Sequence, residues 1–236
     1  MPSRGINRIT WDLKYPTPWP VNTDTGKFNP TAKIQSLMFA MPGEYKVSLS
    51  MVTRDGVKEL AAPEVFQTKA LNLATLPAAD YREVVDFQLK AEKLAGSMDA
   101  TERFAADLQK KVILIQQTLN KTPGVPSELM NRAREIEIAL EEIQFRFEGR
   151  EAKASWEEIP PGPMPFNRRL SWLVSTRLES TSGITQTEID AYNILNEEFP
   201  PVLEELMSIF EKLKELYAQL DKAGAPWTPG RIPAWH

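Results

Sequence analysis

The residues of this chain that could take part in chemistry are mainly carboxylates and aromatic rings. The sequence has no cysteine, and its one histidine is the last residue, His236. A histidine-based catalytic triad, a histidine general base and a thiol nucleophile are therefore excluded elsewhere in these 236 residues. Any reaction or binding event has to use carboxylates, aromatic side chains or other oxygen ligands.

The first candidate binding site is a proline-rich loop, Tyr15-Pro16-Thr17-Pro18-Trp19-Pro20. Aromatic rings that prolines hold in place can stack on sugar rings, so Tyr15 and Trp19 are candidate carbohydrate-binding residues. The alternative is that both rings pack against a neighbouring sheet or helix, because large aromatic side chains bury much apolar area. The packing interpretation is favoured, and carbohydrate binding is the alternative.

The second candidate is a metal-binding loop at Asn22-Thr23-Asp24-Thr25-Gly26. Oxygen ligands at alternating positions before a glycine are typical of the start of a calcium loop, which makes Asn22 and Asp24 candidate metal ligands. The distal bidentate glutamate of a full calcium loop is missing, and an Asx turn explains the pattern equally well. The turn is favoured, and no cofactor is expected.

Pairs of adjacent glutamates are the third candidate. A glycosidase needs two carboxylates across a cleft, whereas adjacent residues on a helix point apart. A di-metal centre in a helical bundle uses Glu-x-x-His motifs, for which no histidine is available. Glu157-Glu158, beside Trp156 in a loop, is the least implausible catalytic pair, but solvated surfaces are favoured and no enzyme is expected. The pairs are Glu141-Glu142, Glu157-Glu158, Glu197-Glu198 and Glu204-Glu205.

Composition limits the partners of the chain. The net charge of −4 and the isoelectric point near 5.3 argue against nucleic-acid binding, which depends on neutralising phosphates. No stretch approaches the 18 apolar residues of a membrane span, and the first residues lack the hydrophobic region of a signal peptide. We therefore expect no nucleic-acid partner and no membrane span, in either an intracellular protein or an excised fragment.

The spacing of apolar residues predicts one very long helix. From Val84 to Leu119, an apolar or small residue recurs in alternating steps of three and four, without a change of phase at Gly96-Ser97. The pattern predicts a single helix over about residues 79–121, whose narrow stripe is typical of a coiled coil or helical bundle. The stripe consists of Val84, Phe87, Ala91, Leu94, Met98, Thr101, Ala105, Leu108, Val112, Ile115 and Leu119.

The same spacing recurs in three later segments, and short connections join them. We therefore predict an antiparallel four-helix bundle over residues 78–224 and a proline-rich tail over 225–236. The phase continues through Pro200-Pro201, which predicts one bent helix there. Thr101 and Asn196 fall on core positions, where polar residues fix register. The segments are Leu129–Phe147, Phe166–Arg177 and Ile189–Leu220.

Residues 1–77 show the two-residue period of β-strands. Arg54-Asp55-Gly56 lies between two alternating segments and predicts a hairpin. About five strands are expected, whereas a complete immunoglobulin-like sandwich has about seven. We therefore predict an α+β fold that begins with a partial immunoglobulin-like β-sandwich. The expected strands are Ile9–Leu13, Ile34–Ala40, Tyr45–Met51, Val57–Leu60 and Val65–Leu71.

Three passages resemble a known family of large bacterial proteins. Gly5-Ile6-Asn7-Arg8-Ile9-Thr10-Trp11-Asp12-Leu13 resembles the G-x-N-R-x-x-W-D-L strand of their immunoglobulin-like modules. Pro42-Gly43-Glu44-Tyr45-Lys46-Val47-Ser48-Leu49 resembles the P-G-x-Y-x-V-x-L strand. The Pro165–Leu178 segment, followed by Ile184-Thr185, resembles the helical region after that module. These proteins carry sortilin-like or BNR-repeat β-propellers and are often described as glycosyl-hydrolase-like.

The resemblance covers only the segment after the propeller, so it implies an architecture and no catalytic residue here. It implies an extracytoplasmic protein if the chain is a fragment; otherwise a cytoplasmic one is expected. We expect a non-catalytic accessory region that buries an interface against its own propeller or another protein. The alternatives are a carbohydrate-binding module that uses the Tyr15–Pro20 loop, and a fragment of a glycoside hydrolase whose active site lies elsewhere. Exposed strand edges further predict a homodimer of the isolated chain.

Overall fold

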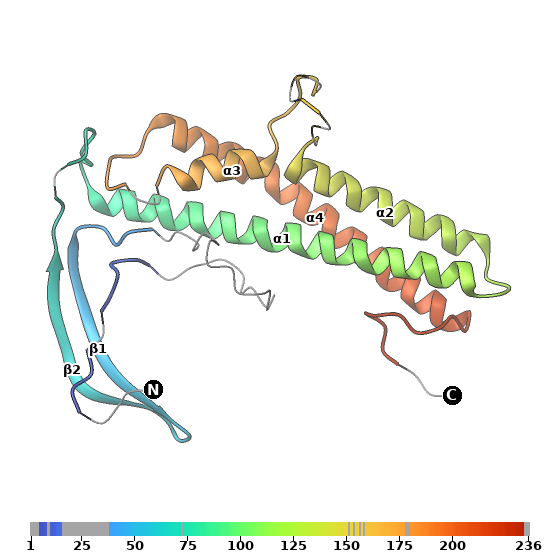
Figure 1. Cartoon of the computed structure of the whole chain (residues 1–236), viewed down its shortest axis with the longest axis horizontal. Coiled ribbons are helices and arrows are strands. Elements are labelled where there is room, and N and C mark those ends of the chain that lie inside the picture. The colour runs from blue at the N-terminus through green and yellow to red at the C-terminus, as the bar shows by residue number, and fades with distance from the viewer. Residues whose placement is uncertain are drawn as a thin grey trace. The chain divides into compact units, whose positions relative to one another are not determined.

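The fold is α+β, as predicted, with two antiparallel strands followed by four helices, one of them long (Figure 1). This computed structural model describes residues 5–8, 10–15, 38–71, 73–150, 152, 154–155, 157, 159–177 and 180–233. In chain order the elements are β1 (Gly43–Thr53), β2 (Gly56–Thr68), α1 (Tyr81–Lys121), α2 (Ser127–Glu148), α3 (Phe166–Ser175) and α4 (Gln186–Lys222).

The chain divides into two compact units, and helix α1 runs through both. The first unit contains the described residues of 1–17, 24–90 and 175–186, and therefore both strands. The second contains the described residues of 91–174 and 187–236, and therefore most of the helical residues.

The two strands form the predicted hairpin. Thr53 is paired with Gly56 across the turn residues Arg54 and Asp55. Gly56 has a φ of 127°, a conformation that residues with a Cβ rarely adopt. The Thr53 hydroxyl donates to the Gly56 carbonyl at 3.0 Å and accepts from the Asp55 N–H at 3.3 Å, so the turn is tied at both ends.

The strand count differs from the prediction. The segments Val57–Leu60 and Val65–Leu71, predicted as two strands, lie largely within the single strand β2. The pairing steps from Glu64 to Ala61 on β2 while β1 advances by only two residues, which is a bulge rather than a turn. Pro63 lies in this bulge, where its missing N–H breaks no regular pairing. The described residues show this one sheet and not a sandwich.

The N-terminal motif is not a strand in its described residues. The Asp12 side chain accepts a hydrogen bond from the Lys14 N–H at 3.2 Å, and Leu13 has a φ of 60°. An Asx turn of this kind bends the backbone out of the extended conformation. The described residues of the predicted strand Ile9–Leu13 are therefore not a strand, and the following residue, Lys14, forms an isolated antiparallel bridge with Phe39.

Helix α1 confirms the long helix predicted from apolar spacing. It spans Tyr81–Lys121 and continues through Gly96-Ser97 without a break. Every residue of the predicted stripe is buried except Phe87, which is half-buried. Thr101 belongs to the buried stripe, and its hydroxyl donates to the Ser97 carbonyl at 2.8 Å.

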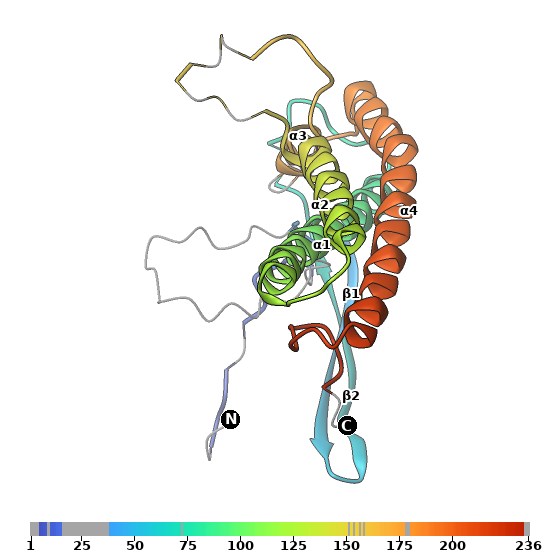
Figure 2. The ribbon, with the colours of Figure 1, turned by 90° about the vertical axis from the view of Figure 1, so that its right-hand side faces the viewer.

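Figure 2 shows the helices of the second unit as ribbons, and direct side-chain contacts join them. α1 contacts α2 and α4, α2 contacts α4, and α3 contacts both α1 and α2. The core residues that the spacing predicts for α2 are all buried, namely Leu129, Ala133, Ile136, Leu140, Ile143 and Phe147. The contacts are Gln116–Glu137 at 2.8 Å, Phe104–Phe210 at 5.3 Å, Arg146–Glu205 at 3.2 Å, Asn167–Glu102 at 2.6 Å and Phe147–Phe166 at 5.4 Å.

Helix α4 is a single helix through Pro200-Pro201, as predicted. These prolines cannot donate to the carbonyls of Asn196 and Glu197, four residues earlier. Both of those residues are exposed, so water can bond the two carbonyls. The missing donors therefore fall on the solvated side of the helix, which explains how the helix tolerates two consecutive prolines.

The core face predicted for α4 is wrong by one residue over part of its length. The predicted residues are Ile189, Tyr192, Asn196, Phe199, Leu203, Leu206, Phe210, Leu213, Tyr217 and Leu220. Asn196 is exposed, so its predicted role in fixing register is also wrong. Apolar residues occupy adjacent positions in this helix, as at Val202-Leu203 and Ile209-Phe210, so the sequence offers two overlapping stripes and packing selects one. The buried residues are Glu188, Ala191, Leu195, Phe199, Val202, Leu206, Ile209, Leu213, Leu216 and Leu220.

The sequence places Gly149 at the end of α2 and Ser127 near its start as a candidate cap; the first prediction is confirmed and the second is wrong. Gly149 ends the helix with φ 77° and ψ −159°, and its N–H donates to the Phe145 carbonyl at 2.8 Å. A Cβ at this position would overlap the Pro165 ring. Ser127 does not cap the start, because it is already the first helical residue and Pro126 occupies the cap position.

Candidate functional site

The candidate functional site is the hairpin formed by residues 43–68, which we call the hairpin arm. Nearly every residue of β1 and β2 is exposed, although an isolated two-stranded hairpin is at best marginally stable in water. Val47, Leu49 and Met51 alternate along β1 and share one face, with exposed fractions of 56, 53 and 44%. We call these three residues the apolar stripe.

The opposite face of the hairpin arm also exposes apolar side chains. Val52 and Val57 are directly paired across the two strands near the turn and are 80 and 72% exposed. Val65 is 52% exposed and is paired with Lys46. Contiguous exposed apolar area on a folded protein marks an interaction surface, so the hairpin arm is suited to burial against another polypeptide.

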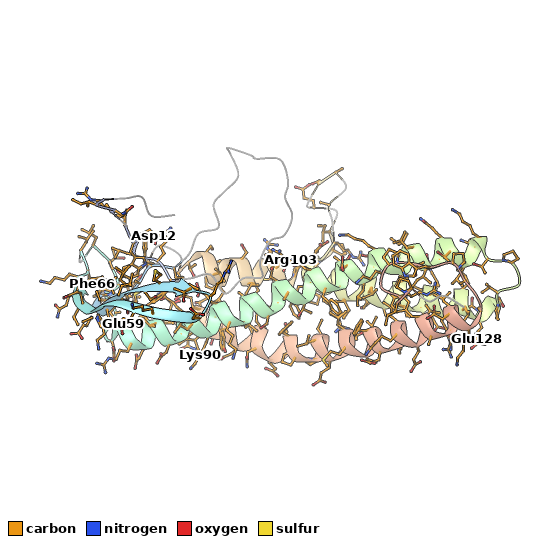
Figure 3. The ribbon with its side chains drawn as sticks, turned by 90° about the horizontal axis from the view of Figure 1, so that it is seen from below. Asp12, Glu59, Phe66, Lys90, Arg103 and Glu128 are labelled. Atoms are coloured by element: carbon orange, nitrogen blue, oxygen red, sulfur yellow. The ribbon has the colours of Figure 1, made fainter. Side chains whose placement is uncertain are left out.

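An aromatic cluster lies at the base of the arm, and Phe66 is labelled there in Figure 3. Trp11, Tyr45 and Phe66 form this aromatic base. The centroid of the Trp11 ring lies 5.3 Å from that of Tyr45 and 5.9 Å from that of Phe66. Tyr45 is on the same face of β1 as the apolar stripe, so the contact with Trp11 covers only the beginning of that face.

Hydrogen bonds fix the aromatic base to the backbone. The Tyr45 hydroxyl donates to the Met41 carbonyl at 2.7 Å, which leaves its oxygen free to accept from the Tyr15 hydroxyl at 3.1 Å. Burial first, and then the bond with Tyr15, raise the pKa of the Tyr45 hydroxyl above its ordinary value. Tyr45 therefore stays protonated as a structural donor. The Trp11 indole N–H donates to the Lys14 carbonyl at 2.9 Å.

The candidate ligands predicted from sequence fall mostly outside the described residues. Trp19, Asn22 and Asp24 are not described, so carbohydrate binding at the loop and calcium binding remain predictions. Tyr15, the other member of the predicted carbohydrate site, is half-buried at the aromatic base. Of the pair Glu157-Glu158, only Glu157 is described; it is exposed.

Two carboxylates on α1 have pKa values that burial raises. Burial raises the pKa of Glu92 to about 7. Burial also raises the pKa of Glu102, although a hydrogen bond from Asn167 opposes this shift. The two carboxylates are ten residues apart on one helix, or about 15 Å, whereas the carboxylates of glycosidases are about 5 to 9.5 Å apart. This pair does not match that geometry.

The described residues offer neither a metal site nor a membrane-spanning helix. No group of three or more histidine, cysteine, aspartate or glutamate side chains among them is arranged to hold a metal ion. None of the described helices combines the length and apolar character needed to cross a bilayer. The second finding agrees with the expectation from sequence that there is no membrane-spanning helix.

The sequence predicts the hairpin but not its exposure. Alternation along β1 is the same whether a second sheet covers the apolar face or not, so it gives no warning that the face is open. The signal that was available is Leu60-Ala61-Ala62-Pro63, which interrupts the alternation and contains a proline. Such a segment indicates a bulged edge strand rather than the interior of a sheet.

Comparisons with known proteins find no relative of this chain. No protein-family model, no curated protein and no solved structure matches the chain. The function therefore has to be argued from the hairpin arm, its apolar stripe and its aromatic base.

Proposed function

We propose that this chain is a non-catalytic accessory region that docks on another polypeptide through the hairpin arm. The observation that carries the proposal is the exposure of apolar residues on both faces of a long two-stranded sheet. Burying the apolar stripe would contribute about 25 cal/mol for each Å² removed from water. That gain offsets the weakness of an isolated hairpin.

The proposal includes a finer architecture than two strands and four helices. The hairpin arm is the described part of a partial immunoglobulin-like sandwich, and strands from the docking partner cover the face that carries the apolar stripe. The helices form an antiparallel four-helix bundle that serves as a rigid scaffold. Contacts among the helices of the second unit, such as Phe104–Phe210 and Phe147–Phe166, support this arrangement.

The resemblance to the propeller-bearing family suggests the partner. In that family the corresponding segment follows a β-propeller, so we propose the propeller of an exported protein as the docking surface. No reaction is assigned to the chain, and any hydrolase chemistry would belong to the propeller. Hydrolysis of chromogenic glycosides by the purified chain would overturn the non-catalytic part of this proposal.

The docking proposal is tested by amide hydrogen exchange across residues 43–68. The reading frame upstream of Met1 is examined first for a propeller, and the two parts are then produced separately and mixed. Exchange in the hairpin arm should slow on mixing, because docking pairs and covers its amides. Unchanged exchange over the whole arm at saturating propeller, or an upstream frame without a propeller, would overturn this choice of partner.

A matched pair of variants identifies the docking face. Val47→Ser removes an apolar group from the stripe and should weaken the protection of the arm. Met207→Ser removes an apolar group of similar exposure, 62% against 56% for Val47, from helix α4 of the second unit. It should leave the protection unchanged. Equal effects of the two variants would count against docking through the hairpin arm.

A further inference from the structure

The two outer edges of the hairpin arm are not equivalent. β2 has 13 residues against 11 in β1, and both irregularities of the pairing place the additional residues on β2. One of them contains Pro63, which has no N–H to donate to a neighbouring strand. Bulges and prolines prevent strand addition, so the outer edge of β2 is blocked against pairing with another chain.

The outer edge of β1 has none of these protections. Its sequence, GEYKVSLSMVT, contains no proline, and it carries no additional residue of either bulge. Alternate N–H and C=O groups of an edge strand point away from its partner, and among the described strands only β2 pairs with β1. The arm therefore offers one regular edge for strand addition.

The sequence of β1 is complementary to itself in an antiparallel arrangement. If two copies pair with Leu49 opposite Leu49, then Val47 of each copy lies opposite Met51 of the other. The two apolar stripes then lie side by side on one face of the two central β1 strands. On the other face of the sheet, Ser48 of each copy lies opposite Ser50 of the other copy. Their hydroxyls stay exposed to water there, so no polar group is desolvated.

Charge selects this register among its neighbours. With Leu49 at the centre, Glu44 of each copy lies beside the hairpin turn of the other copy, where Arg54 is the first residue after β1, which allows two opposite-charge pairs. A register centred on Ser50 instead places Lys46 opposite Arg54, which is a repulsive pair. A register centred on Ser48 leaves Glu44 opposite the uncharged Val52. A register in which Leu49 faces Ser50 would place the apolar stripes of the two copies on opposite faces of the sheet.

We infer that a second copy of this chain pairs with the outer edge of β1, antiparallel and centred on Leu49. The product is a four-stranded sheet with strand order β2–β1–β1–β2. This inference rests on the proposed function in one respect, that the hairpin arm is an interaction surface, and it names the partner that the arm takes when the chain is by itself. Pairing through main-chain hydrogen bonds makes it a case of β-strand addition.

Charge reversal tests the register. In Glu44→Arg or Arg54→Glu, both attractive pairs of the dimer become repulsive, and the dimer Kd measured by sedimentation should rise about tenfold. The double variant Glu44→Arg/Arg54→Glu restores opposite charges and should return the Kd to within about threefold of the starting value. Within one copy, the two residues are about 33 Å apart along β1, so no contact inside a copy explains a rescue.

Mixing the two single variants gives an independent signature. In a mixed dimer, the copy with Glu44→Arg meets the copy with Arg54→Glu, and both charge pairs are attractive. The equimolar mixture should therefore form more dimer than either variant alone at the same total concentration. A mixture that behaves as the average of its components would overturn the register.

A cysteine at the symmetry axis tests the centre of pairing directly. The chain contains no cysteine, so Leu49→Cys introduces a single thiol. Facing residues in an antiparallel pair have Cα atoms about 4.5 to 5.5 Å apart, within the range that a disulfide spans. Leu49→Cys should form a covalent dimer on mild oxidation. Leu60→Cys, on β2 with an exposed fraction of 50% against 53% for Leu49, should form little covalent dimer under the same conditions.

The outcomes separate this inference from the proposed function. A monomer over a wide concentration range, or a dimer that ignores the charge variants and the cysteine at position 49, overturns the β1 pairing. If such a chain still gains protection in the hairpin arm when the propeller is added, the proposed function stands alone. A dimer that meets both tests while the propeller gives no protection supports the inference and removes the propeller as partner.

Discussion

Leu49 in the hairpin arm and Leu140 in helix α2 have the same side chain in opposite surroundings, since the first is 53% exposed and the second is 0% exposed. Both belong to regular apolar patterns of the sequence. In the second unit, helices contact one another through side chains, and the apolar stripe of α2 is buried. In the hairpin arm, two strands leave both faces open. A regular apolar pattern therefore identifies a surface that needs burial, and among the described residues the covering partner is present in only one of the two regions.

The largest expected contrast comes from removing a large apolar side chain in each region. Phe147→Ala should lower the free energy of unfolding of the helices by about 3–5 kcal/mol, because Phe147 is fully buried against Phe166. Leu49→Ala should change it by no more than about 0.5 kcal/mol, because its side chain is exposed in the single chain. Urea denaturation followed by helical circular dichroism, at concentrations below any dimerisation, measures both. Similar losses in the two variants would contradict the contrast.

The next largest expected effect is the pH dependence of stability that arises from the buried carboxyl of Glu92, which is 6% exposed. Burial raises its pKa to about 7 in the folded chain, whereas the unfolded carboxyl titrates near its ordinary pKa of 4.5. Between these values the folded state binds more protons than the unfolded state, so stability falls as pH rises from about 4.5 to 7 and then levels off. A shift of this size corresponds to about 3 kcal/mol.

Glu92→Gln tests this assignment because an amide is similar in shape and does not titrate. The variant should lose most of that decline and should be more stable than the unsubstituted chain above pH 7; Glu102, whose pKa burial also raises, keeps a smaller decline. Glu83→Gln changes an exposed carboxylate of the same helix and should keep the full decline. The measurement is the free energy of unfolding against pH, and a decline of undiminished size in Glu92→Gln would assign it to another group.

A smaller effect is expected where α2 ends. Gly149→Ala should cost about 2 kcal/mol, because φ 77° with ψ −159° is a conformation restricted to glycine and a Cβ would also meet Pro165. Gly124→Ala is the matched control, since Gly124 has a φ of 73° but a Cβ there would meet no atom within 4 Å. Its cost should be about 1 kcal/mol. Thermal denaturation of both variants gives the comparison, and equal losses would show that the Pro165 contact is unimportant.

The sequence predicted the helical region better than the β region for a physical reason. In α1, a buried stripe requires apolar residues at every third or fourth position, and successive turns of a long helix repeat that constraint many times. In α4, pairs such as Ile209-Phe210 satisfy two stripes at once, so only the packed structure chooses between them. In β1, alternation reports the pleat of the strand and is independent of what lies above it. The same is true of the candidate ligands Trp19, Asn22 and Asp24, whose residue types allow a site without requiring one.

The most local expected effect is at the aromatic base, and it sharpens the comparison. Trp11→Ala removes two aromatic contacts from the hairpin arm, each of about 0.5–1.5 kcal/mol beyond the area buried. Because Trp11 is 41% exposed and covers only the first residues of the face, the loss should be local. Amide exchange should rise in residues 43–68 and stay unchanged in α2, which belongs to the second unit. Exchange in α2 that rises to the same extent would mean that the two regions unfold together. The hairpin arm and the helices would then differ in exposure but not in their stability to unfolding.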